Sequence, residues 1–334
     1  MATTAPPRRA RAASYLLLLA VLVAALLGCS RSAENKDSGD AAAARVKLAL
    51  NWVAEPEFGG FYAAREGGAF KRAGLDVEIM NGGPGVPVVQ MVAGGQVEFG
   101  IVGGDDVITA RARGADVIPI FAVYQISPHA IMAHASRGAK GIADLLQGGT
   151  LAVEPGAPYA AYLKKKYGFD KVKIVPYDGG VARFVVDKDF AQQCFITSEP
   201  IAARQKGVEP QVFLIADEGY TPYNAVVITR KALWKEKPDQ VRAFARAARE
   251  GWRAYLDDPA QVNAVMGNLN TTMDAETFRL GAQAQVRLID DEPGKKLGRM
   301  TRERWEALGK QLVELGIVKE APPVDDYLIA VDGG

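Results

Sequence analysis

Strand-like and helix-like segments alternate from Val46 onward, and this alternation constrains the fold more than any other feature of the sequence. Short runs rich in Val, Ile and Leu predict strands over 46–50, 75–79, 97–103 and 116–123. The segments between them have helical spacing over 59–74, 86–95 and 105–114. Such successive βαβ units favour parallel strands with right-handed crossovers, and they place functional loops at the carboxyl ends of the strands.

A second series with the same order follows. It predicts strands over 149–156, 171–177, 192–197 and 210–216. It predicts helices over 158–168, 179–186 and 199–207. The repetition favours two similar α/β lobes, each with a parallel-rich sheet flanked by helices, over one long sheet.

The chain is expected to cross between these lobes twice, near 124–134 and near 220–229. It then returns as helices over 238–258, 273–289 and 301–316, which should cover the first lobe. The predicted first lobe is therefore 45–125 plus 228–334, and the predicted second lobe is 126–227. Two lobes with two crossings leave a cleft between them, and ligand sites concentrate at such interfaces.

The N-terminal region, residues 1–28, predicts an export signal. Three arginines precede an uncharged apolar run over 15–27, which is too short to span a bilayer as a permanent helix. The run closes on "LLGCS", with Gly28 directly before Cys29, and this resembles the lipobox of bacterial lipoproteins. The resemblance implies cleavage before Cys29, acylation of its sulfur and an exported protein held at the membrane by that lipid. An uncleaved signal anchor is the alternative, although such anchors usually have longer apolar cores.

The segment 29–44 predicts a flexible tether, because after Cys29 it is small, polar and free of aromatic residues. Removal of the signal takes away three arginines and leaves 37 basic against 39 acidic side chains. That balance gives no reason to expect nucleic-acid binding. With Cys29 lipidated, Cys194 is the one remaining cysteine, so no intrachain disulfide can form, and we expect Cys194 in the core.

Residues that directly follow predicted strands are candidates for ligand contacts. Asn51 and Trp52 follow the first strand and should face the cleft, although Trp52 could instead cap the core. Glu199 precedes Pro200 at a helix start. Its carboxylate therefore either complements the helix N-terminus or accepts hydrogen bonds from a ligand.

Other candidates come from turns and crossings. Asp105 is predicted as a helix N-cap and Gly104 as a point where backbone can approach a ligand, with capping alone as the alternative. Four tyrosines near crossings or strand ends could close over a ligand: Tyr124, Tyr159, Tyr177 and Tyr223.

Catalysis has little support in the sequence. Neither a GxSxG nor an HExxH pattern occurs, and His129 and His134 cannot form a metal cluster with the lone Cys194. We expect both histidines to be structural, and we expect no cofactor, no metal site and no enzymatic activity.

Three stretches follow one another in the chain: "LNW…GGFYAAREGGAFKRAGLDVEI", "GGPGVPVVQMVAGGQVEFGIVGGDDVITARARG" and "QQCFITSEPIAARQKGV". With these stretches the chain resembles, over roughly residues 46 to 290, the SsuA/THI5-like, or NMT1/THI5-like, substrate-binding proteins of ABC transporters. The resemblance implies a two-lobed periplasmic-binding-protein fold of type II with a ligand cleft between the lobes. It also implies a monomer that captures a small molecule and delivers it to the transmembrane subunits of an ABC permease.

The resemblance extends to the branch that binds pyrimidine precursors of thiamine. That branch has an aromatic residue where Trp52 stands and a histidine where Phe58 stands, and here the histidine is missing. Trp52, Phe58, Phe61 and Tyr62 keep an aromatic wall suited to stacking on a flat ring, with the core as the alternative place for Phe61 and Tyr62. The expected ligand is thus a small aromatic heterocycle, a thiamine pyrimidine precursor or a related vitamin such as riboflavin.

Two alternatives remain open. A sulfonate- or nitrate-type anion binder of the same superfamily would need Arg, Lys or helix starts at the cleft, whereas the first turn carries Glu55 and Glu57. An enzyme similar to the thiamine pyrimidine synthases would need a cysteine-rich iron-binding segment. Here "QQCFITSEP" holds one cysteine, and the export signal disfavours a cytosolic synthase.

Overall fold

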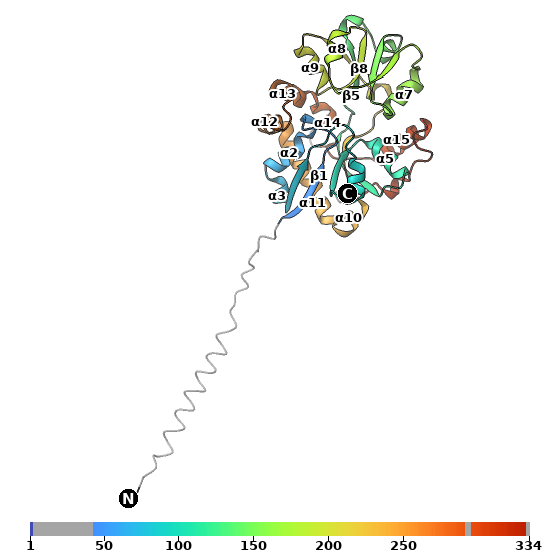
Figure 1. The fold of residues 1–334 in the computed structure, drawn as a ribbon. Helices are drawn as coiled ribbons and strands as arrows, with labels where there is room; N and C mark the ends of the chain where they lie inside the picture. The colour runs from blue at the N-terminus through green and yellow to red at the C-terminus, as the bar shows by residue number, and fades with distance from the viewer. Residues whose placement is uncertain (3–42, 291–294, 332–334) are drawn as a thin grey trace. The chain divides into compact units, whose positions relative to one another are not determined.

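The computed structural model describes residues 1–2, 43–290 and 295–331, and the fold is that of the compact unit from residue 43 onward (Figure 1). Apart from its first two residues, the predicted signal lies outside the described residues. Cys29 and nearly all of the predicted tether lie outside them too.

Five strands of the described chain form a first sheet in the order β2-β1-β3-β10-β4. They are β1 (Ala44–Ala49), β2 (Leu75–Met80), β3 (Phe99–Val102), β4 (Val117–Tyr124) and β10 (Asn224–Arg230). β1 runs parallel to β2 and β3, whereas β10 is antiparallel to β3 and β4. Every residue of β4 is buried, as expected for a strand with helices on both faces of its sheet.

The second sheet repeats this arrangement in the order β7-β6-β8-β5-β9. Its strands are β5 (His129–His134), β6 (Thr150–Val153), β7 (Lys173–Pro176), β8 (Phe190–Phe195) and β9 (Pro210–Leu214). β6 is parallel to β7 and β8, and β5 is antiparallel to β8 and β9. The two mixed sheets flanked by helices confirm the predicted α/β fold class. Each sheet has as many antiparallel as parallel pairings, so the expectation of parallel-rich sheets is wrong.

We call each sheet with its helices a lobe. The predicted lobe boundaries, 45–125 plus 228–334 and 126–227, stay a prediction. The two segments predicted as crossings contain the antiparallel strands β5 and β10, so each crossing also contributes a strand to a sheet.

Helices of the first lobe surround its sheet in Figure 1. They are α2 (Gly59–Glu66), α3 (Ala69–Arg72), α4 (Val88–Ala93), α5 (Gly104–Ala112), α10 (Lys231–Glu236), α11 (Pro238–Asp257), α12 (Ala260–Leu269), α13 (Ala275–Ala284), α14 (Val286–Ile289) and α15 (Arg302–Glu314). Helices of the second lobe are α6 (Ile142–Leu145), α7 (Pro158–Tyr167), α8 (Ala182–Val186) and α9 (Glu199–Gln205). Short 3₁₀ turns are η1 (Pro56–Phe58), η2 (Ala135–Arg137), η3 (Ala216–Glu218) and η4 (Val324–Asp326).

Helix α11 packs directly against α2 because two glycines allow it. A Cβ on Gly59 would lie 2.1 Å from the ring of Tyr255, and a Cβ on Gly60 would lie 2.1 Å from the ring of Trp252. Both rings belong to α11 and are buried. The close approach fixes the start of α2, and with it the turn between β1 and α2.

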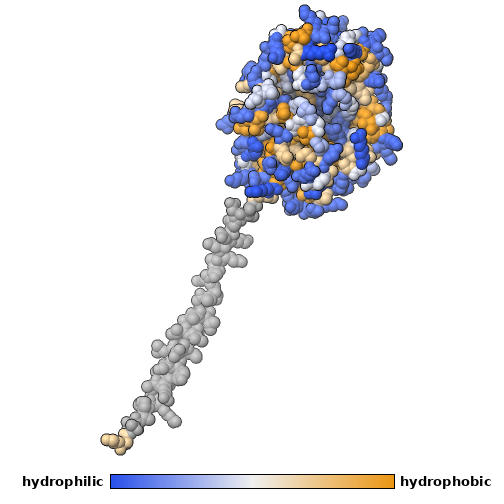
Figure 2. Space-filling view, viewed as in Figure 1, coloured by the Kyte–Doolittle hydropathy of each residue, from blue (hydrophilic) through white to orange (hydrophobic). Residues whose placement is uncertain are grey.

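Aromatic stacking fills the core beneath α11. Phe244 lies between Phe70 and Phe99, with ring centroids 5.0 and 3.9 Å apart, so α3, β3 and α11 share one apolar layer. Polar side chains cover much of the surface in Figure 2, interrupted by scattered apolar patches, as on most folded proteins.

Candidate functional site

The candidate site lies where loops follow the carboxyl ends of parallel strands in both lobes. In α/β folds these strand ends carry ligand contacts. Six acidic residues stand there: Glu55 and Glu57 after β1, Asp105 and Asp106 after β3, Glu154 after β6, and Glu199 after β8. We call these six residues the interlobe acids.

The loop after β1 is held in place from its far side by carboxamides of the C-terminal helical region. The side chain of Asn270 donates to the carbonyl oxygen of Ala54 at 3.1 Å, and that of Gln285 donates to the carbonyl oxygen of Pro56 at 2.9 Å. Tyr124 in turn donates to the side chain of Gln285 at 2.6 Å. These buried bonds fix the backbone that carries Glu55 and Glu57.

Trp52 lies on the open side of the same loop. Its indole N–H donates to Oε1 of Glu55 at 3.2 Å, and its side chain is only partly buried against the core. One edge of the ring is therefore oriented by a hydrogen bond, while part of its surface remains available for contact.

Glu199 brings a carboxylate from the second lobe to this place. It is the first residue of α9, and its carboxylate accepts hydrogen bonds from the backbone N–H of Phe195, at 2.8 Å, and from the hydroxyl of Tyr177. Glu199 thus stands at a helix start, as predicted from the sequence, and its carboxylate also bonds to the end of β8.

Glu55, Glu57 and Glu199 influence one another's ionisation across the lobe boundary. Burial raises the pKa of Glu55 to about 8, and the charge of Glu199 adds to this rise, while the bond from Trp52 opposes it. Burial also raises the pKa of Glu57 well above its usual value, with further contributions from the charges of Glu55 and Glu199. Burial raises the pKa of Glu199, against the hydrogen bonds from Tyr177 and the backbone.

A second group of acids consists of Asp105 and Asp106, which follow β3, and Glu154 of the other lobe, and these groups also influence one another's ionisation. Asp106 keeps exposed surface, but partial desolvation of its carboxyl group raises the pKa to about 7, and the neighbouring charge of Asp105 adds to the rise. Glu154 is exposed as well, and partial desolvation raises the pKa of its carboxyl group, again with a contribution from Asp105, which lies in the other lobe. The hydroxyl of Tyr220 donates to Oδ2 of Asp105 at 2.8 Å, which partly offsets the effect of burial on that carboxyl group.

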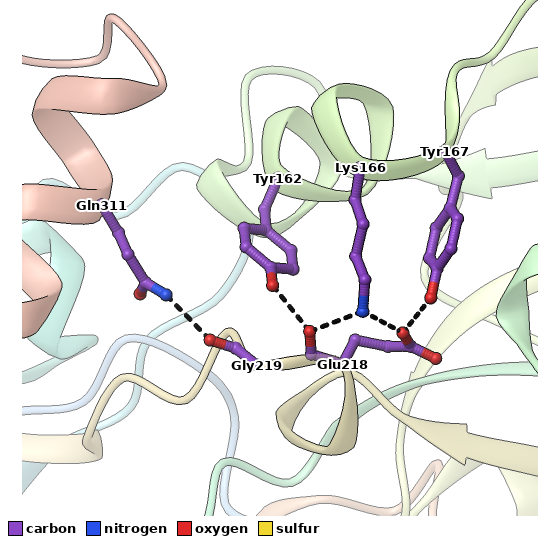
Figure 3. A network of polar contacts seen from close by, with 6 residues as sticks. All are labelled: Tyr162, Lys166, Tyr167, Glu218, Gly219 and Gln311. Carbon is purple, nitrogen blue, oxygen red and sulfur yellow. Dashed lines mark hydrogen bonds and ion pairs between the residues drawn. The ribbon is translucent and has the colours of Figure 1, made fainter.

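The segment that precedes Tyr220 is fixed by the polar network in Figure 3. The Glu218 backbone carbonyl accepts from Tyr162 and Lys166, and its carboxylate accepts from Lys166 and Tyr167. Gln311 of α15 donates to the carbonyl oxygen of Gly219 at 2.8 Å. Side chains from α7 and α15 therefore hold η3, and with it the donor to Asp105.

Tyr159 lies near acids of both groups, since the charges of Glu154 and Glu199 both act on its hydroxyl, and His129 packs against it. Tyr159 accepts from the backbone N–H of Glu154 at 3.2 Å and donates to the side chain of Gln193. The His129 ring stacks on Tyr159 at 5.4 Å and packs edge-on against Phe195 at 4.4 Å. Burial lowers the pKa of His129 to about 4, so this imidazole is neutral at pH 7 and acts as packing.

The structure brings four predicted site residues to the interlobe acids or among them: Trp52, Asp105, Tyr159 and Glu199. The predicted N-cap role of Asp105 needs correction. Gly103 stands at the N-cap of α5, and the carboxylate of Asp106 accepts from the Gly103 N–H at 3.0 Å. Asp106 therefore bonds back to the helix N-cap, while Asp105 accepts from the Asp106 N–H through Oδ1, at 3.2 Å, and from Tyr220 through Oδ2.

Phe58 and Tyr62 are placed in the core instead of on a site wall. Neither side chain has exposed surface, and the Tyr62 hydroxyl donates to Oδ1 of Asn81 at 2.9 Å. Tyr124 is equally buried and supports the β1 loop from behind through Gln285. These three predicted contacts are therefore corrected to supporting positions.

Gly104 and Tyr223 have a different structural role from the predicted one. The N–H of Gly104 donates to the carbonyl oxygen of Tyr223 at 2.9 Å, and a Cβ on Gly104 would come within 3.0 Å of that oxygen. Tyr223 itself is covered by the guanidinium of Arg304, 3.8 Å from its ring centroid. The close approach predicted at Gly104 is thus to the chain's own backbone. Asn51 is exposed at the end of β1.

Sequence reasoning noted Glu55 and Glu57 without assigning them to the site, and it missed Asp106 and Glu154. The signal was available, because each follows the carboxyl end of a strand, which is the kind of position already taken as functional for Trp52 after β1. No Lys or Arg side chain lies near enough to any of the interlobe acids to lower its pKa in the part of the chain described.

Other features of the described residues do not compete with this site. Cys194 is buried, as predicted, and burial raises the pKa of its thiol. A surface hollow on α11 is lined by Arg246, Arg249, Glu250 and Arg253 and contains no aromatic side chain. Among described residues, no helix is long and apolar enough to cross a membrane, and no three His, Cys, Asp or Glu side chains are arranged to hold a metal ion.

Comparison with known proteins gives a family and two relatives. Residues 55–262 match the model of a family described as NMT1/THI5 like, which is more than half of the chain. The formylaminopyrimidine-binding protein of Halalkalibacterium halodurans is 25% identical over 305 residues, covering 87% of this chain and 89% of the relative. The riboflavin-binding protein RibY of Chloroflexus aurantiacus is 26% identical over 252 residues, covering 72% and 70%.

Among solved structures, the periplasmic aliphatic sulphonate binding protein SsuA from Escherichia coli shares the fold. The TM-score is 0.67 at 14% sequence identity, and the match covers 85% of this chain and 92% of that one.

Proposed function

Because this chain belongs to the NMT1/THI5-like family, we propose that it is the extracytoplasmic solute-binding protein of an ABC importer. Its ligand is a small aromatic heterocycle, a pyrimidine precursor of thiamine or a related vitamin such as riboflavin, which it delivers to the permease subunits as a monomer. The names of the two relatives, a formylaminopyrimidine-binding and a riboflavin-binding protein, support this ligand class.

One observation carries the proposal: a partly exposed tryptophan stands beside carboxyl groups from both lobes. Trp52 offers a flat face, and its own N–H is already used on Glu55. Glu55 and Glu199, on opposite lobes, offer acceptor oxygens within reach of each other's charge. A flat ring with N–H or amino groups satisfies both features at once.

The same acids disfavour the anion-binding alternative. A sulfonate or nitrate needs Arg, Lys or free helix N-termini. Here the first turns of α5 and α9 carry Asp105, Asp106 and Glu199. A small anion would therefore meet like charge at two helix starts where it would seek N–H donors.

We propose binding without catalysis. The fold alone does not decide this, since one fold can serve both binding proteins and enzymes. Cys194 lacks the properties of a reactive nucleophile, because the thiol is 1% exposed and burial raises its pKa.

Membrane attachment through a lipid on Cys29 is a further part of the proposal, motivated by the lipobox-like "LLGC" and the tether-like segment after it. Replacing Cys29 with Ser should move the protein from the membrane fraction to the soluble fraction without changing its melting temperature. A variant that still pellets with salt-washed membranes would contradict lipid anchoring.

A thermal-shift screen with three ligand classes tests the function. An aminopyrimidine or a flavin at 100 times its dissociation constant should stabilise the folded state by about 2.7 kcal/mol, whereas an alkylsulfonate should leave the melting temperature unchanged. A shift with the sulfonate alone would contradict the proposal and favour the anion-binding alternative.

A further inference from the structure

Glu57 is a buried residue whose carboxylate has no donor from the described chain, and its oxygens are not among the fully buried unpaired side-chain atoms. It is 7% exposed, and its neighbours in η1, Pro56 and Phe58, are buried as well. Within residues 43–290 and 295–331 its carboxylate has no hydrogen bond or ion pair, and the charges that act on it, those of Glu55 and Glu199, have the same sign. The carboxylate oxygens therefore keep some contact with solvent, and a ligand that displaced this water would have to supply donors in its place.

The backbone, and not mutual attraction, brings these acids together. A Cβ on Gly281 of α13 would lie 2.4 Å from the carbonyl oxygen of Thr197 and 3.0 Å from Cγ of Pro56. Thr197 precedes Glu199 in the second lobe, and Pro56 precedes Glu57 in the first. The loops that carry the two carboxylates thus pack on the same position of one helix.

The three carboxyl groups differ in how much of their acceptor capacity is used. Glu199 already accepts from Phe195 and Tyr177, and Glu55 accepts from Trp52. A carboxylate can accept about four hydrogen bonds, so Glu57 has the largest unused capacity of the three.

We propose that Glu57, with Glu55 and Glu199, receives a cationic amino group carried by the ligand ring. This inference rests on the proposed function and narrows the ligand to heterocycles that bear an ammonium or amidinium group at neutral pH. An ammonium group has three donors and a positive charge, which match three acceptors with no basic side chain beside them. An organic cation fits better than a metal ion, because no three such side chains within the described residues are arranged as metal ligands.

The ionisation of Glu55 agrees with a cationic ligand. A pKa of about 8 for Glu55 means that the group keeps a proton at pH 7 when no cation is near. A bound cation would stabilise the ionised form and release that proton. Affinity for a cation should therefore increase with pH.

A matched pair of probes tests the inference by titration calorimetry at pH 7. One is a 4-amino-5-(aminomethyl)pyrimidine, whose side-chain amine is protonated; the other is its N-formyl derivative, in which the same nitrogen is a neutral amide. The wild type should bind the cationic probe at least about tenfold more tightly, the lower limit for a hydrogen bond to a charged group. Glu57→Gln should lose this preference, and Glu78→Gln, which removes an exposed carboxylate in β2, should keep it.

The outcomes separate the two proposals. If both probes bind with equal affinity, or if Glu57→Gln still prefers the cationic probe, the inference of a cationic ligand is wrong, while the proposed binding of a heterocycle stands. If neither probe binds the wild type, the pyrimidine function fails and this inference fails with it. If Glu57→Gln does not fold, a measurement on the wild type alone still tests the inference. Wild-type affinity for the amine should increase between pH 6 and pH 7.5 and that for the amide should not, and equal pH profiles would overturn the inference.

Discussion

Trp52 is the residue whose surroundings differ most from those of the other tryptophans. Its indole is partly buried and bonded to Glu55. Trp252 and Trp305 have no exposed surface, and Trp234 lies under the guanidinium of Arg242 on the outer helices. A ligand between the lobes should therefore change the environment of Trp52 and of no other tryptophan.

We expect the intrinsic fluorescence of the wild type to change on ligand addition and Trp52→Phe to lose most of that change. Phe keeps a flat ring and so retains much of the affinity. Trp52→Ala should weaken binding by at least about 2 kcal/mol, as central aromatic contacts do. Trp234→Phe is the control and should keep the full signal. A Trp52→Ala variant that binds normally but melts at a much lower temperature would assign Trp52 to the core.

At this scale the sequence identified residues that directly follow strands, such as Trp52, Asp105 and Glu199, because the end of a strand fixes a direction in space. That they contact a ligand stays a prediction. It misplaced Phe58 and Tyr62. Aromatic residues at helical spacing fit a site wall and a core equally well, and the choice depends on which helix packs over them. The helix that packs on α2 is α11, which lies about 180 residues further along the chain, so no local pattern reveals which face of α2 is covered.

Among the elements, the pair α2 and α11 determines where the site loop begins. Gly59 and Gly60 let the two helices approach until the rings of Tyr255 and Trp252 rest on the α2 backbone. The turn that carries Glu55 and Glu57 leads directly into this contact. Displacing α2 should therefore affect the site as well as the core.

Gly60→Ala tests this coupling. The added methyl group would lie 2.1 Å from the buried Trp252 ring, and such overpacking typically costs about 1 to 3 kcal/mol of unfolding free energy. Ligand affinity should fall together with the melting temperature. Gly267→Ala in α12 is the control, because its Cβ would make an ordinary 3.7 Å contact with Phe278, and helix propensity favours Ala. Gly60→Ala with unchanged affinity would separate the helix contact from the site.

The order of most elements was predictable from periodicity, whereas their pairing was not. Strands over 75–79 and 116–123 and the long helix over 238–258 correspond to β2, β4 and α11. The placement of β5 and β10 as antiparallel strands was missed, because pairing over such distances leaves no local trace. Helices α10 and α12 were not predicted separately within the helical return.

For the molecule as a whole, the interlobe acids make folding depend on pH. Their pKa values are raised in the folded state, to about 8 for Glu55 and about 7 for Asp106, and the other four are also raised. The unfolded chain ionises these groups near pH 4. Above that pH the folded state therefore holds more protons, and its stability decreases as pH increases.

We expect the unfolding free energy of the ligand-free protein to decrease between pH 6.5 and pH 8. A shielded group that stays protonated only in the folded state, such as Glu57, contributes a slope of up to about 1.4 kcal/mol per pH unit. The exposed Asp106 and Glu154 contribute less, because solvent screens their charges. His129, with a folded pKa of about 4 and a usual value of 6.5, acts below this window, where it lowers stability as pH falls. Denaturant titrations at several pH values measure the slope, and Glu55→Gln should reduce it. Stability that rises from pH 6.5 to 8 would contradict the raised pKa values.

The shared strand order of the two sheets has a consequence for how such a protein diverges in evolution. β1 corresponds to β6, and β3 to β8, so Glu57 and Glu154 follow equivalent strands, as do Asp105 and Glu199. In both lobes, the loops after these two equivalent strands are the ones that would contact a ligand bound between the lobes. A lineage can therefore acquire a new solute by substitutions in four short loops while both sheets keep their sequence. Duplicated genes with this architecture could thus change cargo quickly and still keep the surfaces by which a permease recognises them.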